Sequence, residues 1–181
     1  MKVLVVRHGK TDFNVGGKRL GKEDADLNEE GKNEALEIKK ELKGNYNILI
    51  CSPMKRTRQT ADIIFPGRDL IINDLIVPYD FGELQGVPFD TPYSKFPNNR
   101  VEKHGGKEYL MPNKGESFEE FVTRCKKFIK YLKKNFNEDD KIAVFTHSTF
   151  IAVLIALSRS KPWYTYLDKT RGLKGSIEIE I

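Results

Sequence analysis

The chain has few of the residues that build disulfide frameworks or metal centres. Its 181 residues include only two cysteines, Cys51 and Cys125, and three histidines. Two cysteines are too few for a disulfide framework, and nothing else in the sequence indicates an oxidising compartment. The histidines are far apart, and no His-x-x-x-His or Cys-x-x-Cys pair occurs, which argues against a zinc site.

Long hydrophobic runs are also missing. No apolar stretch approaches the 18 or so residues of a membrane span. The apolar run that follows Lys2 ends at Arg7, which is shorter than the hydrophobic region of a signal peptide. We therefore expect one compact domain over residues 1–181, located in the cytoplasm.

Positive charge is in excess, with a net charge of +5 and a sequence pI near 9.1. This excess favours an anionic ligand without saying which kind. Much of it lies between Arg124 and Lys134, where lysines alternate with apolar residues at helical spacing, as on an ordinary solvated helix face. Charge is the only feature that suggests a nucleic-acid binder, and a solvated helix face accounts for much of that charge. We therefore expect neither nucleic acid nor a membrane as partner.

Short apolar runs alternate with helical patterns, which is typical of an α/β three-layer sandwich. We expect a mostly parallel sheet with helices on both faces. The alternating pattern of the last segment predicts an edge strand. The predicted strands are Lys2–Arg7, Asn47–Cys51, Leu70–Leu75, Lys141–Thr146 and Ser176–Ile181.

Helix signals are clear at two N-termini. Asn28 is a good N-cap, and Ser117 with Glu120 forms a capping box. Residues 86–115 are rich in proline, glycine and aromatic residues, which favours a packed lid over a linker, although a simple cap on the sheet edge fits equally well. The predicted helices are Asn28–Leu42, Lys55–Ile64, Ser117–Asn135 and Thr149–Leu157.

Three of the predicted strands end in unusual polar sequences. Arg7 and His8 follow the first strand, Arg56 comes shortly after the second, and His147 follows the fourth. Ligands of parallel sheets bind at the carboxyl ends of the strands, so these four side chains are expected at one edge. Two guanidiniums and two imidazoles suit a phosphate, because arginine binds its oxygens in pairs and histidine can act as nucleophile. His104 has no such context and is assigned to the surface.

A cysteine-based phosphatase is a different possibility that the spacing disfavours. Such a site needs Cys-x5-Arg, whereas Cys51 has four residues before Arg56 and six before Arg58. Pro53 also removes a backbone N–H from the loop that would hold the phosphate. Cys51 is better interpreted as a small buried residue.

The order of these motifs resembles the histidine phosphatase superfamily, in its phosphoglycerate mutase-like branch. The matching stretches are Arg7-His8-Gly9-Lys10-Thr11-Asp12-Phe13-Asn14, residues 21–31 with Asp26 in place of a proline, residues 52–61, Gly115-Glu116-Ser117 and Val144-Phe145-Thr146-His147. Together they span nearly the whole chain.

The resemblance implies a role for each matching residue. His8 would attack phosphorus and form a phosphohistidine, while Arg7, Arg56 and His147 would hold the non-bridging oxygens. Asn14 would line the same pocket, with Gly21 where the chain passes close to the ligand. No metal or other cofactor is required, and the expected partner is a small phosphorylated metabolite. Neighbouring cations would keep His8 unprotonated and reactive near neutral pH.

The usual proton donor of the family is missing. It is a glutamate four residues before a glycine, and here Pro78 occupies that place before Gly82. Asp80 is the first substitute, because residues two apart on an extended segment project to the same side. Glu83 is the second. A good leaving group would need no strong acid, and Asp80 can equally be a turn residue.

The sequence therefore predicts a metal-independent phosphatase that works through phospho-His8. Alternatives are a phosphoglycerate mutase-like phosphomutase and a non-catalytic phosphate-binding module, the latter because of Pro78. A phosphatase is favoured over a mutase because a mutase must retain its intermediate in a closed pocket, and the chain is short.

Overall fold

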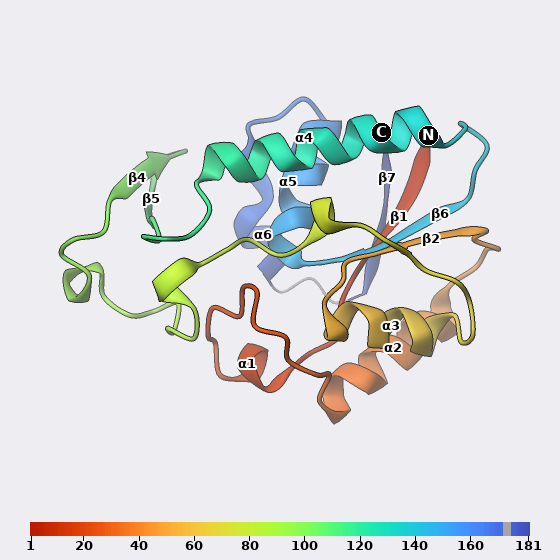
Figure 1. The fold of residues 1–181 in the computed structure, drawn as a ribbon, viewed down its shortest axis with the longest axis horizontal. Helices are drawn as coiled ribbons and strands as arrows, with labels where there is room; N and C mark the ends of the chain where they lie inside the picture. Colours follow the sequence, from red (N-terminus) through yellow and green to blue (C-terminus); the bar gives the residue numbers. More distant parts are fainter. Residues whose placement is uncertain (172–174) are drawn as a thin grey trace.

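The computed structural model describes residues 1–171 and 175–181 and shows a mixed, mostly parallel sheet between two layers of helices (Figure 1). The strand order is β3-β2-β6-β1-β7. Strands β1 (Lys2–Arg7), β2 (Ile48–Cys51), β3 (Ile71–Ile72) and β6 (Ile142–Thr146) run parallel. β7 (Ser176–Glu180) pairs antiparallel with β1 at one edge, so the predicted α/β class and edge strand are confirmed.

Each face of the sheet has its own core because neighbouring residues of a strand point to opposite sides. In β1, Val3 and Val5 belong to one apolar cluster, whereas Leu4 and Val6 belong to the other. The first face is covered by α4 (Phe118–Asn135) and α5 (Ser148–Ser158), and the second by α2 (Glu29–Glu41) and α3 (Lys55–Ile64) (Figure 1).

The helix ends follow from the sequence. The side chain of Asn28 accepts a hydrogen bond from the backbone N–H of Gly31 at the start of α2. Ser117 and Glu120 form the expected capping box of α4. α5 is apolar on all sides, and Phe150 through Ala156 are buried, as expected for a helix enclosed by other elements.

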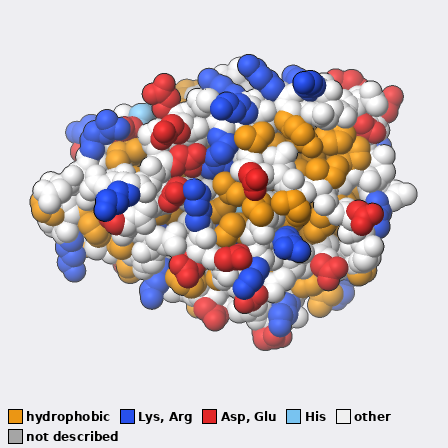
Figure 2. All heavy atoms as spheres, in the orientation of Figure 1, with side chains coloured by type: hydrophobic (Ala, Val, Ile, Leu, Met, Phe, Trp, Pro, Cys, Tyr) orange, Lys and Arg blue, Asp and Glu red, His pale blue; other side chains and the backbone are white. Residues whose placement is uncertain are grey.

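The basic stretch of α4 is a solvated face, as the spacing indicates. Its lysines are exposed, and Lys and Arg side chains line the edge of the molecule where α4 lies (Figure 2). Below them, hydrophobic side chains gather on the same face (Figure 2). At the β3 edge, Ile71 and Ile72 are 41% and 47% exposed.

Residues 86–115 contain structure that the sequence did not predict. A 3-10 turn (Tyr93–Lys95) precedes a two-stranded antiparallel sheet of β4 (Val101–His104) and β5 (Lys107–Leu110). This hairpin packs against the 3-10 helix Trp163–Tyr166, with ring centroids of His104 and Trp163 4.9 Å apart. His104 is therefore partly buried, and its assignment to the surface was wrong, because the hairpin folds back onto the C-terminal aromatics.

The remaining helices are short, and two of them are the 3-10 helices Asp74–Ile76 and Gly82–Leu84. α1 (Asp12–Val15) follows the end of β1, and α6 (Leu167–Arg171) follows the 3-10 helix Trp163–Tyr166. Within residues 1–171 and 175–181, no helix has the length and hydrophobicity needed to cross a bilayer.

Candidate active site

The side chain of His8 lies at the carboxyl end of β1, in a loop fixed to two other elements. The backbone N–H of His8 donates to the carbonyl of Thr146 at the end of β6, at 3.1 Å. The next residue, Gly9, contacts the start of α2 so closely that a Cβ there would lie 2.2 Å from the carbonyl oxygen of Gly31. Glycine at position 9 thus allows the loop to pass directly against α2.

The imidazole of His8 has one nitrogen committed to the backbone. Its Nδ1 is 2.7 Å from the carbonyl oxygen of Gly9, so Nδ1 carries the proton and donates it there. The lone pair is therefore on Nε2, the nitrogen on the opposite side of the ring.

Burial and neighbouring cations keep both histidines of the site unprotonated. Desolvation, and next the positive charge of Arg56, hold the pKa of His8 well below its ordinary value, and Arg7 adds to this shift. The pKa of His147 is lowered in the same way by burial and Arg56. The two rings are close, with centroids 5.2 Å apart.

Arg56 enters the site from the first turn of α3 and is 1% exposed. Its Nη1 donates to the carbonyl of Glu23 at 2.6 Å and its Nη2 to that of Gly21 at 2.8 Å. Burial lowers its pKa to about 10, so it still carries its charge at neutral pH. Its Nε is buried and makes no hydrogen bond within the described residues.

His147 is held by Ser52, a residue to which the sequence analysis gave no role. Ser52 Oγ is 3.0 Å from His147 Nε2, and Arg56 Nη2 is 3.5 Å from Nδ1. Because a guanidinium only donates, Nδ1 is the acceptor and Nε2 carries the proton toward Ser52. The position of Ser52 directly after β2 was the available signal.

The histidines and arginines of the site line one cavity of about 420 Å³. Arg7, His8, Asn14, Gly21, Arg56 and His147 all lie on its wall. Asn14 is fixed there because its Oδ1 accepts from the backbone and hydroxyl of Thr11. The structure thus brings together six of the eight site residues that the sequence singled out.

Asp80 and Glu83 do not line this cavity. Asp80 pairs with Lys22 at 2.8 Å and accepts from the backbone N–H of Gly82. Despite an opposing effect of partial burial, these contacts lower the pKa of Asp80. Glu83 is exposed and accepts from Asn99 and from the backbone of Asn113.

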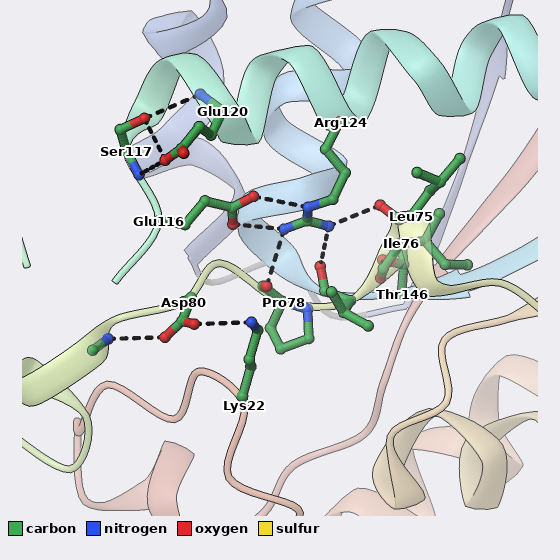
Figure 3. Close-up of polar contacts among 12 residues, drawn as sticks. Lys22, Leu75, Ile76, Pro78, Asp80, Glu116, Ser117, Glu120, Arg124 and Thr146 are labelled. Carbon is green, nitrogen blue, oxygen red and sulfur yellow. Dashed lines mark hydrogen bonds and ion pairs between the residues drawn. The ribbon is translucent and has the colours of Figure 1, made fainter. Parts of the chain in front are cut away.

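Pro78 does line the cavity, on a segment that Arg124 holds in place (Figure 3). Arg124 projects from α4 and donates to the carbonyls of Leu75, Val77 and Pro78 at 2.8, 2.8 and 3.2 Å. Its guanidinium also forms a bidentate pair with Glu116, at 2.8 and 2.7 Å. Glu116 belongs to the Gly115-Glu116-Ser117 motif, and the sequence alone indicates no separate role for it.

The remaining wall of the cavity is rich in aromatic side chains. They come from the segment after Pro78, from the hairpin region and from the start of α4, and are Tyr79, Phe81, Phe89, Tyr93, Tyr109 and Phe118. At the end of the cavity that holds the arginines and histidines, His8, Arg56 and His147 are buried, whereas Phe89 in the aromatic part is 37% exposed. The cavity therefore has a buried cationic end and an aromatic, more open part.

Other chemistries find little support among the described residues. In residues 1–171 and 175–181, no group of three or more His, Cys, Asp or Glu side chains is arranged to hold a metal ion. Cys51 is buried, and burial raises the pKa of its thiol to about 12, so it is not a thiolate near neutral pH.

The buried histidines predict a marked loss of stability in mild acid. Since their folded pKa values lie below the unfolded value near 6.5, the unfolded state binds more protons once the pH falls below about 6.5. Stability should then fall by up to about 1.4 kcal/mol per pH unit for each histidine. Urea unfolding at pH 6.5 and 5.5 in phosphate-free buffer measures this slope.

The control is the double variant His8→Asn/His147→Asn, which retains His104 and all carboxylates. Its stability should depend much less on pH in this window, because depressed carboxylates such as Asp80 lose their contribution only at lower pH. Equal slopes for the two proteins would show that the histidines are not held neutral.

The chain is similar to known proteins over most of its length. The chain is 29% identical over 164 residues to "Uncharacterized phosphatase PhoE" of Bacillus subtilis, covering 88% of this chain and 79% of that protein. It is 25% identical over 162 residues to a 2,3-bisphosphoglycerate-dependent phosphoglycerate mutase of Bartonella bacilliformis, covering 84% and 79%.

A solved structure shares the fold. The putative alpha-ribazole-5'-P phosphatase of Escherichia coli superimposes with a TM-score of 0.77 at 24% identity, covering 91% of this chain and 82% of that one. The sequence model of the histidine phosphatase superfamily (branch 1) matches residues 3–171, nearly the whole chain. The protein belongs to the histidine phosphatase superfamily, branch 1.

Proposed function

We propose that the protein is a metal-independent phosphatase that hydrolyses a small phosphomonoester through a phosphohistidine at His8. The observation that carries this proposal is the pair of buried, unprotonated imidazoles beside two guanidiniums at one end of the cavity. A neutral imidazole is a nucleophile, and the fixed cations stabilise charge on the phosphoryl oxygens.

Each side chain has a distinct task in this scheme. Nε2 of His8 attacks phosphorus, while Nδ1 keeps its proton and donates it in a hydrogen bond to the carbonyl of Gly9. Arg7 and Arg56 bind the non-bridging oxygens, and the buried Nε of Arg56 is a donor that a phosphate oxygen can satisfy. His147 completes the oxygen-binding set when its Nε2–H turns from Ser52 to a phosphoryl oxygen, with Asn14 on the wall and the carbonyl of Gly21 orienting Arg56.

A trapping experiment tests this function. The protein should hydrolyse p-nitrophenyl phosphate in the presence of EDTA. Rapid quenching with a ³²P-labelled substrate should leave label on the protein that is stable to base and released by acid, as a phosphoramidate is. A protein that binds phosphate without turnover or label would instead be a phosphate-binding module.

The mutase alternative is supported by the Bartonella relative and makes a different prediction. A mutase returns the phosphoryl group to the same carbon skeleton, whereas a phosphatase releases it to water. Release of inorganic phosphate in proportion to substrate consumed is the expected result. Label retained in an isomer of the substrate would favour the mutase.

A further inference from the structure

Among the described residues of the cavity wall, no carboxyl or imidazole group is placed to protonate the leaving oxygen. The lysines there are Lys18 and Lys107, of which Lys107 is paired with Asp168, and a lysine ammonium is a much weaker acid than a carboxyl group. His8 and His147 are unprotonated near neutral pH, and arginine does not give up its proton at that pH. Pro78 has no ionisable group. The hydroxyl of Tyr79 is a weak acid, because burial raises the pKa of this phenol.

The carboxylates nearby are paired with cations. Glu108 and Asp168 lie on the cavity wall, but Glu108 pairs with Lys103 at 3.0 Å and Asp168 pairs with Lys107. Asp80 pairs with Lys22 outside the cavity. Both carboxylates on the wall are thus engaged by lysines, and the contacts of Asp80 with Lys22 and Gly82 lower the pKa of Asp80, so Asp80 is a poor proton donor.

Without an acid, the leaving oxygen must depart as an anion. This is feasible for a phenol, whose pKa is about 10 in tyrosine, and much less so for an alkyl alcohol, whose pKa is nearer the ~15.7 of water. Because the described part of the site has no proton donor for the leaving oxygen, substrates with a more acidic leaving group should react faster.

The aromatic part of the cavity selects for shape. Phe81 and Phe89 pack edge to face, with centroids 5.9 Å apart, and both line the cavity. The guanidinium of Arg19 lies over the ring of Phe89, 4.7 Å from its centroid, which holds that ring in position. Tyr109 of the hairpin adds another aromatic surface. Such walls favour flat rings, which stack or pack edge to face on them.

We propose that the substrate is an aryl phosphate, whose ring lies against Phe81, Phe89 and Tyr109 and whose phenolic oxygen leaves without a proton from the protein. This inference rests on the proposed function and narrows its substrate class. In this proposal, residues 86–115 contribute to substrate binding, because Phe89 and Tyr109 belong to that segment.

The chemical steps balance without an acid. The lone pair of His8 Nε2 forms the N–P bond while the P–O bond to the ring breaks, and its electron pair leaves with the aryloxide. Water then attacks phosphorus, the N–P bond breaks, and His8 recovers its neutral form. Dihydrogen phosphate and aryloxide leave and exchange a proton in solution.

A series of leaving groups tests the inference. We expect kcat/KM to fall steeply from p-nitrophenyl to phenyl phosphate, and alkyl phosphates such as glycerol phosphate to react at least ~10²-fold more slowly than phenyl phosphate. Alkyl and phenyl phosphates reacting at similar rates would overturn the inference while leaving the phosphatase intact. Failure to hydrolyse any of them would contradict the proposed function itself.

Pro78→Glu is the matched gain-of-function variant. A protonated glutamate at this buried position should raise the rate on alkyl phosphates by ~10-fold or more and change the p-nitrophenyl rate little. Pro78→Gln, which has the same size and no acidic proton, is the control. Equal effects of the two variants would show that position 78 does not supply a proton to the leaving group.

Three further variants ask whether another residue donates the proton. Asp80→Asn, Glu83→Gln and Tyr79→Phe should leave the ratio of p-nitrophenyl to phenyl phosphate rates unaltered. A selective loss on phenyl phosphate in any of them would identify a proton donor in the protein and overturn the inference.

Acetyl phosphate separates leaving-group acidity from ring recognition, because it has an acidic leaving group and no ring. Phe89→Leu should raise KM for phenyl phosphate several-fold and leave acetyl phosphate unaffected. Equal effects on both substrates would mean that the aromatic wall does not bind the ring.

Discussion

Replacing His8 with alanine is expected to reduce the turnover of p-nitrophenyl phosphate by at least ~10⁴-fold, the scale seen when a covalent nucleophile is removed. The reason is that, in the proposed scheme, His8 Nε2 is the atom that takes the phosphoryl group, while Nδ1 donates its proton to the carbonyl of Gly9. Steady-state kinetics in EDTA measures the loss, and quench labelling should show no phosphoprotein.

The control is His104→Asn, at a histidine that packs against Trp163 and does not line the cavity. Its turnover should stay within a few-fold of the wild type. If His8→Ala retained substantial activity, water or another residue would be the nucleophile, and the phosphohistidine scheme would fail. Inorganic phosphate should still protect His8→Ala against unfolding, because Arg7 and Arg56 remain.

Arg124→Met is expected to lower the free energy of unfolding by about 3 kcal/mol, which is typical of breaking a largely buried ion pair. The Glu116 carboxylate, 15% exposed, would lose its partner, and the carbonyls of Leu75, Val77 and Pro78 would lose a donor. Contact of the guanidinium with the ring of Phe121, 4.8 Å away, would also be lost. Urea unfolding measures the change.

Two comparisons make this result specific. Arg159→Met removes an exposed guanidinium that contacts the hydroxyl and the ring of Tyr166, so it should cost well under ~1 kcal/mol. Adding Glu116→Gln to Arg124→Met should recover part of the loss, because the unpaired charge disappears. A loss below ~1 kcal/mol for Arg124→Met would show that α4 does not hold the Pro78 segment as described.

The sheet was predictable because its strands carry the strongest local signal. In β1 and β6 the apolar runs end where the polar site residues begin, so both the strands and the placement of His8 and His147 follow from the same pattern. β3 is shorter than predicted, because after Ile72 the chain turns away and the backbone of Asn73 makes the last bond, to the carbonyl of Cys51.

The hairpin of β4 and β5 could not be predicted, because its stability is not local. Its residues are mostly exposed and polar. The rings of His104 and Tyr109 hold it against Trp163, which lies 59 and 54 residues later in the chain. The same applies to the candidate acids. Only the fold shows that Asp80 pairs with Lys22 and lies outside the cavity.

The place of Trp163 gives the molecule an intrinsic optical probe. It is the only tryptophan of the chain, and its indole touches Tyr109 and Phe118, two rings on the cavity wall. Tryptophan emission therefore originates from a single indole beside the hairpin. If an aryl phosphate binds as proposed, a shift of Tyr109 would alter the surroundings of that indole, and its fluorescence would report binding and product release without a label.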